Sequence, residues 1–140
     1  MAIPRWEHFE HKADIGVRGY GNSLAEAFNQ AALALSSVIT VLDDIEPTTC
    51  LTIECEAPDY DVLLVDWLNE LVYQMATQRM LFSTFNVEIG GFHLKAEICG
   101  ETADQQKHQP AVEIKGATFT ELKVYQNASG EWVAQCIVDV

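Results

Sequence analysis

The sequence contains few basic residues. Only 8 of its 140 residues are Lys or Arg, whereas 21 are Asp or Glu, which gives a formal net charge of −13. The basic residues form no stripe that could displace counterions from a phosphate backbone, so we expect no direct binding to nucleic acid. They are Arg5, Lys12, Arg18, Arg79, Lys95, Lys107, Lys115 and Lys123. Such an acidic surface suits a metal ion or a basic protein partner, and solubility alone is an equally good explanation.

Paired cysteine motifs are also absent. No two of the four cysteines have the CxxC spacing of a zinc clip or a redox site. They are Cys50, Cys55, Cys99 and Cys136. A chain of this length can bury a sufficient core without a disulfide or a structural metal. We therefore expect four free cysteines, buried as small hydrophobic residues and kept reduced in the cytosol.

Signals for export and for membrane insertion are missing. Pro4, Arg5 and Glu7 interrupt the N-terminal segment before an apolar run can form. The longest apolar stretch, residues 31–42, contains three hydroxyl-bearing residues and is too short to span a bilayer. We expect a soluble, cytoplasmic protein that makes no contact with a membrane.

Several catalytic signatures do not occur. The chain has no GxxxxGK[ST] phosphate loop, no GxSxG elbow and no HExxH zinc helix. Residues 16–21 read G-x-x-G-x-G, which is not the order of a dinucleotide-binding loop, and we interpret these glycines as turn residues. We therefore expect that the protein is not an enzyme.

Two amphipathic helices are predicted. The first begins at a capping box, Ser23 to Glu26, and the second follows Pro58-Asp59, where Asp59 can cap it. Each helix carries one apolar stripe. The stripe residues are Leu24, Phe28, Ala31, Leu35 and Val38 in the first helix, and Leu64, Trp67, Leu68, Leu71 and Met75 in the second. We assign Trp67 to the core.

Alternating segments predict strands. Residues 85–98 alternate on both sides of Gly90-Gly91, which predicts a hairpin with a primed turn. Further strands are predicted over residues 15–20, 49–57, 112–115, 118–125 and 131–140. Consecutive strands without intervening helices indicate an α+β fold, with antiparallel β-sheets packed against two main helices in one domain over residues 1–140.

Two acidic segments near the ends of the chain could form a metal site. Asp14 follows His11-Lys-Ala, and Asp139 precedes the terminal Val140 with its α-carboxylate. Hard divalent cations prefer oxygen ligands, and two carboxylates about 4 Å apart repel by roughly 4 kcal/mol at an effective dielectric of about 20, so a cluster needs a cation or a proton. Spacing alone does not show that Asp14 and Asp139 meet, and two solvated carboxylates remain the alternative.

A polar segment, residues 100–110, offers a second candidate site. Glu101, Asp104 and His108 could bind a metal or contact a partner, because loops on a rigid sheet often carry function. A simple surface connection would have the same composition. These residues therefore stay candidates.

The combined pattern resembles the archease family. No single motif is diagnostic, but the order and spacing of the matching pieces cover nearly the whole chain. They are residues 11–21, 24–28 and 64–71, the residues Glu101, Asp104 and His108, and residues 113–118, 132–134 and 139–140. Residues 119–121 depart from this pattern, because many members have a Tyr-His-Gly-like stretch where this chain has Phe-Thr-Glu.

The resemblance implies a protein cofactor of a GTP-dependent, RtcB-type RNA ligase. Archeases promote guanylylation and repeated turnover of that ligase in tRNA splicing, tRNA processing or RNA repair. The resemblance also implies a divalent metal site, most often calcium, formed by Asp14, Asp139 and oxygens of Val140. His11, Lys115 and residues 101–108 are carried over as further functional contacts. It gives no oligomeric state.

Two other functions stay open at this point. One is a small metal-dependent hydrolase that uses Glu101, Asp104 and His108 around a cation. The other is a general chaperone-like binding module that protects many unrelated proteins. No recognisable pair of nucleophile and base supports the hydrolase.

Overall fold

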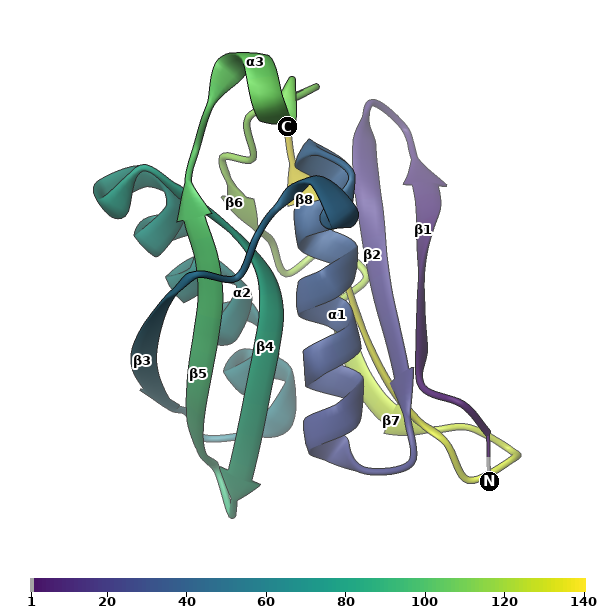
Figure 1. Cartoon of the computed structure of the whole chain (residues 1–140). Helices are drawn as coiled ribbons and strands as arrows, with labels where there is room; N and C mark the ends of the chain where they lie inside the picture. The colour runs from purple at the N-terminus through teal and green to yellow at the C-terminus, as the bar shows by residue number, and fades with distance from the viewer. Residues whose placement is uncertain (1) are drawn as a thin grey trace.

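The computed structural model describes residues 2–140, which form two antiparallel sheets with two main helices (Figure 1). The larger sheet contains β1, β2, β8 and β6 in that order, and β7 also pairs with β8. Its strands are β1 (Arg5–His11), β2 (Asp14–Gly21), β6 (Gly116–Ala117), β7 (Lys123–Gln126) and β8 (Trp132–Asp139). The smaller sheet has the order β3-β5-β4. Its strands are β3 (Thr49–Glu56), β4 (Met80–Gly90) and β5 (His93–Thr102).

The helices join the two sheets. Helices α1 (Leu24–Ile39) and α2 (Tyr60–Gln78) each contact strands of both sheets, so a single core fills the space between them. A 3₁₀ turn, η1 (Leu42–Asp44), and a short helix, α3 (Gln105–His108), lie at the end of the molecule where α1 ends. This architecture confirms the predicted α+β fold.

The predicted helix starts are confirmed. The Ser23 hydroxyl accepts a hydrogen bond from the Glu26 N–H (3.1 Å), and the Glu26 carboxylate accepts one from the Asn22 N–H (2.7 Å). Asp59 caps α2 by accepting from the Val62 N–H at 2.8 Å. These bonds satisfy backbone donors that a helix N-terminus otherwise leaves unpaired.

Trp67 is a core residue, as predicted. Its side chain is fully buried, and its indole Nε1–H donates to the Phe28 carbonyl oxygen at 3.0 Å. Phe28 belongs to α1, so this bond ties the two main helices together. The bond also satisfies a polar group that burial would otherwise leave unpaired.

The β4–β5 hairpin forms with its turn one residue later than predicted. Gly90 pairs with His93, so the turn residues are Gly91 and Phe92. Gly91 has a φ of 59°, which is the positive value that the first position of a type II′ turn requires.

One strand was missed, and two predicted strands were wrong in whole or in part. β1 was not predicted, although it pairs with β2 along its full length. The strand predicted over residues 118–125 is reduced to β7, because residues 118–122 form a bend and a turn. Residues 112–115 form no strand, and the neighbouring β6 covers only Gly116 and Ala117. The N–H of Ala111 donates to the Ile39 carbonyl instead, and that of Lys115 to the Asp139 carbonyl. Residues 111–115 therefore run from the end of α1 to β8, and strand pairing with β8 begins only at β6.

The glycines of residues 16–21 do not form a turn either. They lie within β2, where a Cβ on Gly19 would stand 2.3 Å from the Ala27 carbonyl oxygen of α1. Because glycine has only a hydrogen atom as its side chain, α1 can pack closely against β2 at this position. This close contact, and not a turn, explains the glycine.

The prediction of four free cysteines is wrong for one pair. Cys50 and Cys99 form a disulfide between directly paired positions of β3 and β5. Sequence spacing could not reveal this pair, because 49 residues separate its members and the strand register decides their contact. Cys55 and Cys136 are free, and burial raises the pKa of their thiols to about 11 and about 12.

Within residues 2–140, no helix is long and apolar enough to cross a membrane.

Candidate functional site

The β1–β2 turn presents His11 and Asp14 at one end of the larger sheet. These residues are the last register pair of the two strands, and Lys12 makes the tight turn with a φ of 54°. Directly paired residues of antiparallel strands project to the same face of a sheet. The Nδ1 atom of His11 is buried and has no hydrogen-bond partner, so the fold leaves this polar atom unpaired.

Asp139 reaches the same end of the sheet. β2 pairs antiparallel with β8 from Gly21↔Trp132 to Ile15↔Val138, so Asp14 and Asp139 are the next residues of two neighbouring strands. Asp14 is half-buried and Asp139 is exposed. The fold therefore brings together the two segments that lie almost a whole chain apart in sequence. We call the end formed by His11, Asp14, Asp139 and Val140 the acidic tip.

Lys115 and Val140 also lie at the acidic tip. The Lys115 N–H donates to the Asp139 carbonyl oxygen at 2.8 Å, while the Lys115 side chain is exposed. Val140 is half-buried and packs against the core. The other oxygens at this end are the carboxylates of Asp14 and Asp139 and the main-chain oxygens of Val140, while the Asp139 carbonyl accepts one hydrogen bond.

The donor set of the acidic tip fits a hard divalent cation, because it consists mainly of oxygens with negative charge. Its side chains are not gathered into a closed cage, however. Among residues 2–140, the only set of three His, Cys, Asp or Glu ligand atoms within 4.8 Å of one another is that of Cys50, Glu97 and Cys99. At the acidic tip the described side chains therefore form no such three-residue cluster.

The second candidate set gathers elsewhere, at the end of β5 and on α3. Glu101 accepts hydrogen bonds from the Glu46 N–H (2.8 Å), from Lys107 Nζ (3.0 Å) and from His108 Nε2 (3.0 Å). These donors lower the pKa of Glu101 to about 2, and the Glu46 N–H has the largest effect. Asp104 caps α3 by accepting from the N–H groups of Gln106 and Lys107.

His108 is held as a structural group. It is 2% exposed, and its Nδ1 accepts from the Asp104 N–H at 2.9 Å. In the neutral ring Nε2 then carries the hydrogen and donates to Glu101. Because Glu101, Asp104 and His108 are occupied by one another and by the backbone, they anchor α3 rather than offer an open metal site.

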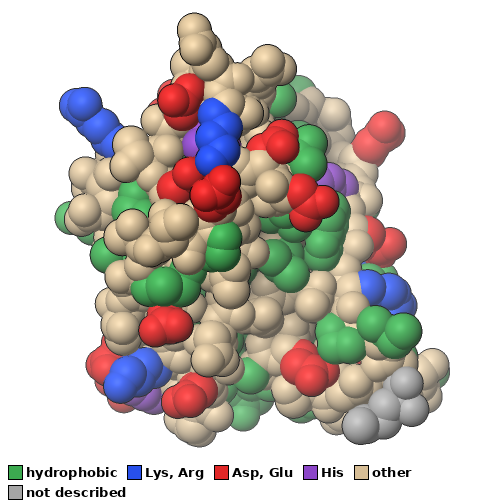
Figure 2. Space-filling view, viewed as in Figure 1, with side chains coloured by type: hydrophobic (Ala, Val, Ile, Leu, Met, Phe, Trp, Pro, Cys, Tyr) green, Lys and Arg blue, Asp and Glu red, His purple; other side chains and the backbone are tan. Residues whose placement is uncertain are grey.

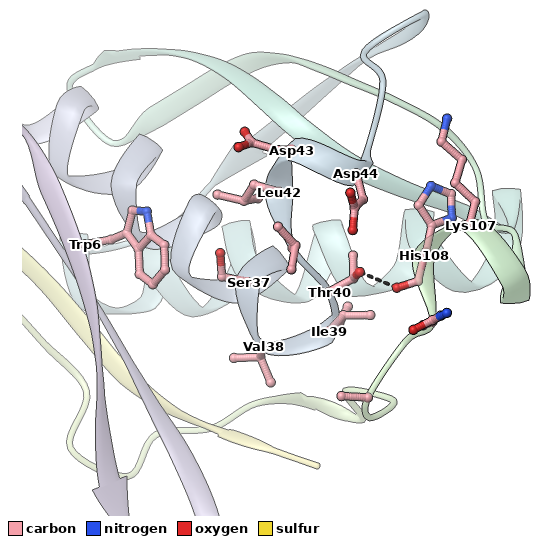
Figure 3. A pocket seen from close by; sticks show the side chains of 13 residues that line it. Trp6, Ser37, Val38, Ile39, Thr40, Leu42, Asp43, Asp44, Lys107 and His108 are labelled. Atoms are coloured by element: carbon pink, nitrogen blue, oxygen red, sulfur yellow. Dashed lines mark hydrogen bonds between the residues drawn. The ribbon is translucent and has the colours of Figure 1, made fainter.

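A groove lies beside this anchor, between the end of α1, η1 and α3 (Figure 3). Its volume is about 780 Å³. Apolar side chains form much of its lining, and Asp43, Asp44, Lys107 and His108 add charged or polar groups. The Thr40 hydroxyl donates to the His108 carbonyl oxygen across its floor. Sequence patterns gave no sign of this groove, because its walls come from three separate segments.

Acidic side chains surround this region. In Figure 2 acidic and hydrophobic side chains both gather on the upper part of the visible face, where α1 and η1 end in Figure 1. Helix α1 has no basic residue in its last turn, so its C-terminal carbonyls add negative potential to that of Asp43 and Asp44. Lys107 also lines the groove, but it is paired with Glu46 and Glu101, so it does not offset the charges of Asp43 and Asp44.

Comparison with known proteins identifies the family. The model of the Archease protein family (MTH1598/TM1083) matches residues 6–140. Protein archease of Thermococcus gammatolerans is 40% identical over 140 residues, which cover 97% of this chain and 99% of the relative. Protein archease of Pyrococcus abyssi is 40% identical over 142 residues, with 99% and 100% coverage. The solution structure of Methanobacterium thermoautotrophicum protein 1598 superimposes with a TM-score of 0.85 at 34% identity and covers 96% of this chain and 98% of that one. The chain therefore belongs to the archease family.

Proposed function

We propose that this protein is an accessory activator of a GTP-dependent, RtcB-type RNA ligase and has no catalytic activity of its own. In this role it promotes guanylylation and repeated turnover of the ligase during tRNA splicing or RNA repair. The observation that carries the proposal is the acidic tip, where two distant acidic segments end side by side in a chain of the archease family.

The residues of the acidic tip have separable roles in this proposal. Asp14, Asp139 and the main-chain oxygens of Val140 hold a divalent cation, and calcium, the ion that the family resemblance implies, accepts oxygen ligands of this kind. When bound, the cation neutralises the repulsion between the two carboxylates. His11 adds its unpaired Nδ1, and the N–H of Lys115 fixes the Asp139 main chain. The open side of the tip faces the ligase.

The groove beside α3 contributes a second contact. Its apolar lining and the negative potential of Asp43 and Asp44 suit a basic, partly apolar segment of the ligase. RNA remains with the ligase, because a net charge of −13 repels its phosphates.

Replacement of Asp14 tests the proposal. Asp14→Asn and Asp139→Asn should each lower guanylylation and multiple-turnover ligation by the cognate ligase at least about tenfold, a loss of roughly 1.4 kcal/mol of coupling. Glu88→Gln, at an exposed position of β4 outside the tip, is the matched control and should activate like the wild type. Undiminished activation by both tip variants would refute the role of the acidic tip.

The same assay separates the other functions. Phosphoester hydrolysis by the purified protein alone would favour a metal-dependent hydrolase. Suppression of aggregation of an unrelated protein, at the concentration that activates the ligase, would favour a general chaperone-like module. We expect neither.

A further inference from the structure

A second cluster of possible metal ligands lies on the smaller sheet, far from the acidic tip in sequence and on different strands. Cys50 of β3 and Cys99 of β5 are register partners with a Cα–Cα distance of 4.1 Å. Glu97 lies two residues before Cys99, and side chains that alternate along a strand return to the same face after two residues. The Cys99 sulfur is 3.9 Å from Glu97 Oε1.

The three side chains lie close together, with the two sulfurs joined by the disulfide and the Glu97 carboxylate beside them. Their ligand atoms all lie within 4.8 Å of one another. Cys50 and Glu97 are exposed, so an ion and a coordinating water can reach the cluster from solvent, whereas Cys99 is 6% exposed and is held by the sheet. The backbone ladder between β3 and β5 fixes the spacing of both cysteines. The cluster is therefore both accessible and built on rigid elements.

The disulfide occupies both sulfurs in the structure. A dithiol reductant would break the Cys50–Cys99 bond by transferring two electrons and two protons, leaving two thiols while the reductant becomes a cyclic disulfide. Binding of a divalent ion then releases the two thiol protons to solvent, because the thiolate is the ligand. Two thiolates, one carboxylate and one water make a four-coordinate set of the kind that zinc accepts.

We propose that reduced Cys50 and Cys99, together with Glu97, bind a thiophilic divalent cation of the zinc class, and that disulfide formation closes this site. Sulfur ligands distinguish it from the acidic tip, whose oxygen ligands suit hard cations such as calcium. The protein then carries two chemically different cation sites on its two sheets, and only the one on the smaller sheet responds to oxidation.

Cobalt titration tests the proposal, because thiolate ligands give Co²⁺ a charge-transfer absorption in the near ultraviolet. The full chain is reduced with a dithiol, freed of reductant without oxygen, and titrated with Co²⁺ and then with Zn²⁺. We expect one equivalent of thiolate-bound cobalt in the reduced protein, displacement by zinc, and no such band in the oxidised protein.

Variants assign the band to its ligands. Cys50→Ser should abolish it, whereas Cys136→Ser and Asp14→Asn should leave it unchanged. Glu97→Gln should weaken zinc binding at least about tenfold, because loss of even an indirect metal partner costs roughly that much. Circular dichroism checks that each variant is folded. Absence of the band in the reduced wild type, or its persistence in folded Cys50→Ser protein, would overturn the proposal.

Discussion

The role of Glu101 depends on the hydrogen-bond donors that the fold places around its carboxylate. The polar composition of residues 100–110 marked Glu101 as a candidate contact, but its main hydrogen-bond donor is the N–H of Glu46, which is 55 residues away in sequence. Lys107 and His108 complete the set. Sequence reasoning could therefore name this carboxylate, whereas its structural role depends on the fold that brings Glu46 to it.

Replacement of Glu101 should change how stability depends on pH. Its pKa falls from 4.5 to about 2 in the folded state, so the folded protein binds this proton more weakly than the unfolded chain does. The resulting stabilisation is fully present above about pH 4.5 and is lost as the pH falls to about 2. Urea unfolding at a series of pH values measures this effect. Glu101→Gln should have a lower free energy of unfolding than the wild type at neutral pH, and this difference should shrink as the pH falls from about 4.5 to about 2. A gap that is constant with pH would contradict this assignment, and Glu88→Gln serves as the control.

Trp67 carries a prediction about the core. Trp67→Phe removes the indole donor that joins the two helices and leaves a cavity in the core, which together should cost about 3 kcal/mol. The free energy of unfolding in urea measures this loss. A loss below about 1 kcal/mol would mean that the bond between α1 and α2 contributes little.

At the scale of elements, helices were predicted more reliably than strands. α1 and α2 carry local information, namely a cap and an apolar stripe, and both formed as expected. β1 lacks clear alternation and depends on pairing with β2, so its sequence did not reveal it. Residues 112–115 have strand-like composition, but in the structure they connect the end of α1 with β8 and pair with no strand. Tertiary pairing decided these cases over local preference.

Gly19 carries the corresponding prediction for the contact between α1 and β2. An added methyl group would lie 2.3 Å from the Ala27 carbonyl oxygen and 2.4 Å from the Ala31 nitrogen, and these backbone atoms can move only with the helix. Gly19→Ala should therefore destabilise the protein by about 2 kcal/mol or more, whereas Gly90→Ala has open space and should cost much less. Thermal unfolding of both variants measures the difference. Equal melting temperatures would contradict this packing argument.

At the scale of the whole molecule, composition predicted the sign of the surface charge but not where on the surface that charge lies. The net charge follows from counting, whereas the placement of the β1–β2 turn, the end of β8 and α3 at one end of the molecule depends on the topology (Figure 1). The order of β2 and β8 in the larger sheet is the decisive information, and no local pattern contains it. For the same reason the sequence could name Asp14 and Asp139 but could not bring them to one place.

Charge reversal at the groove tests whether this distribution matters. On the proposed function, Asp43→Lys with Asp44→Lys should slow association with the ligase about tenfold or more at low salt, and added salt should reduce the difference. Glu54→Lys with Glu56→Lys makes the same change in net charge on β3 and is the matched control. Stopped-flow binding measures the association rate. Equal slowing by both pairs would assign the effect to net charge alone.

The position of β8 affects how the chain reaches its native state. This strand pairs with β2 on one side and with β6 and β7 on the other, yet it follows all of them in sequence. During synthesis the β1–β2 hairpin therefore emerges with one edge unsatisfied until nearly the entire polypeptide has been made. Such late, long-distance pairing slows folding and leaves the free edge of β2 exposed to pairing with other chains during that interval.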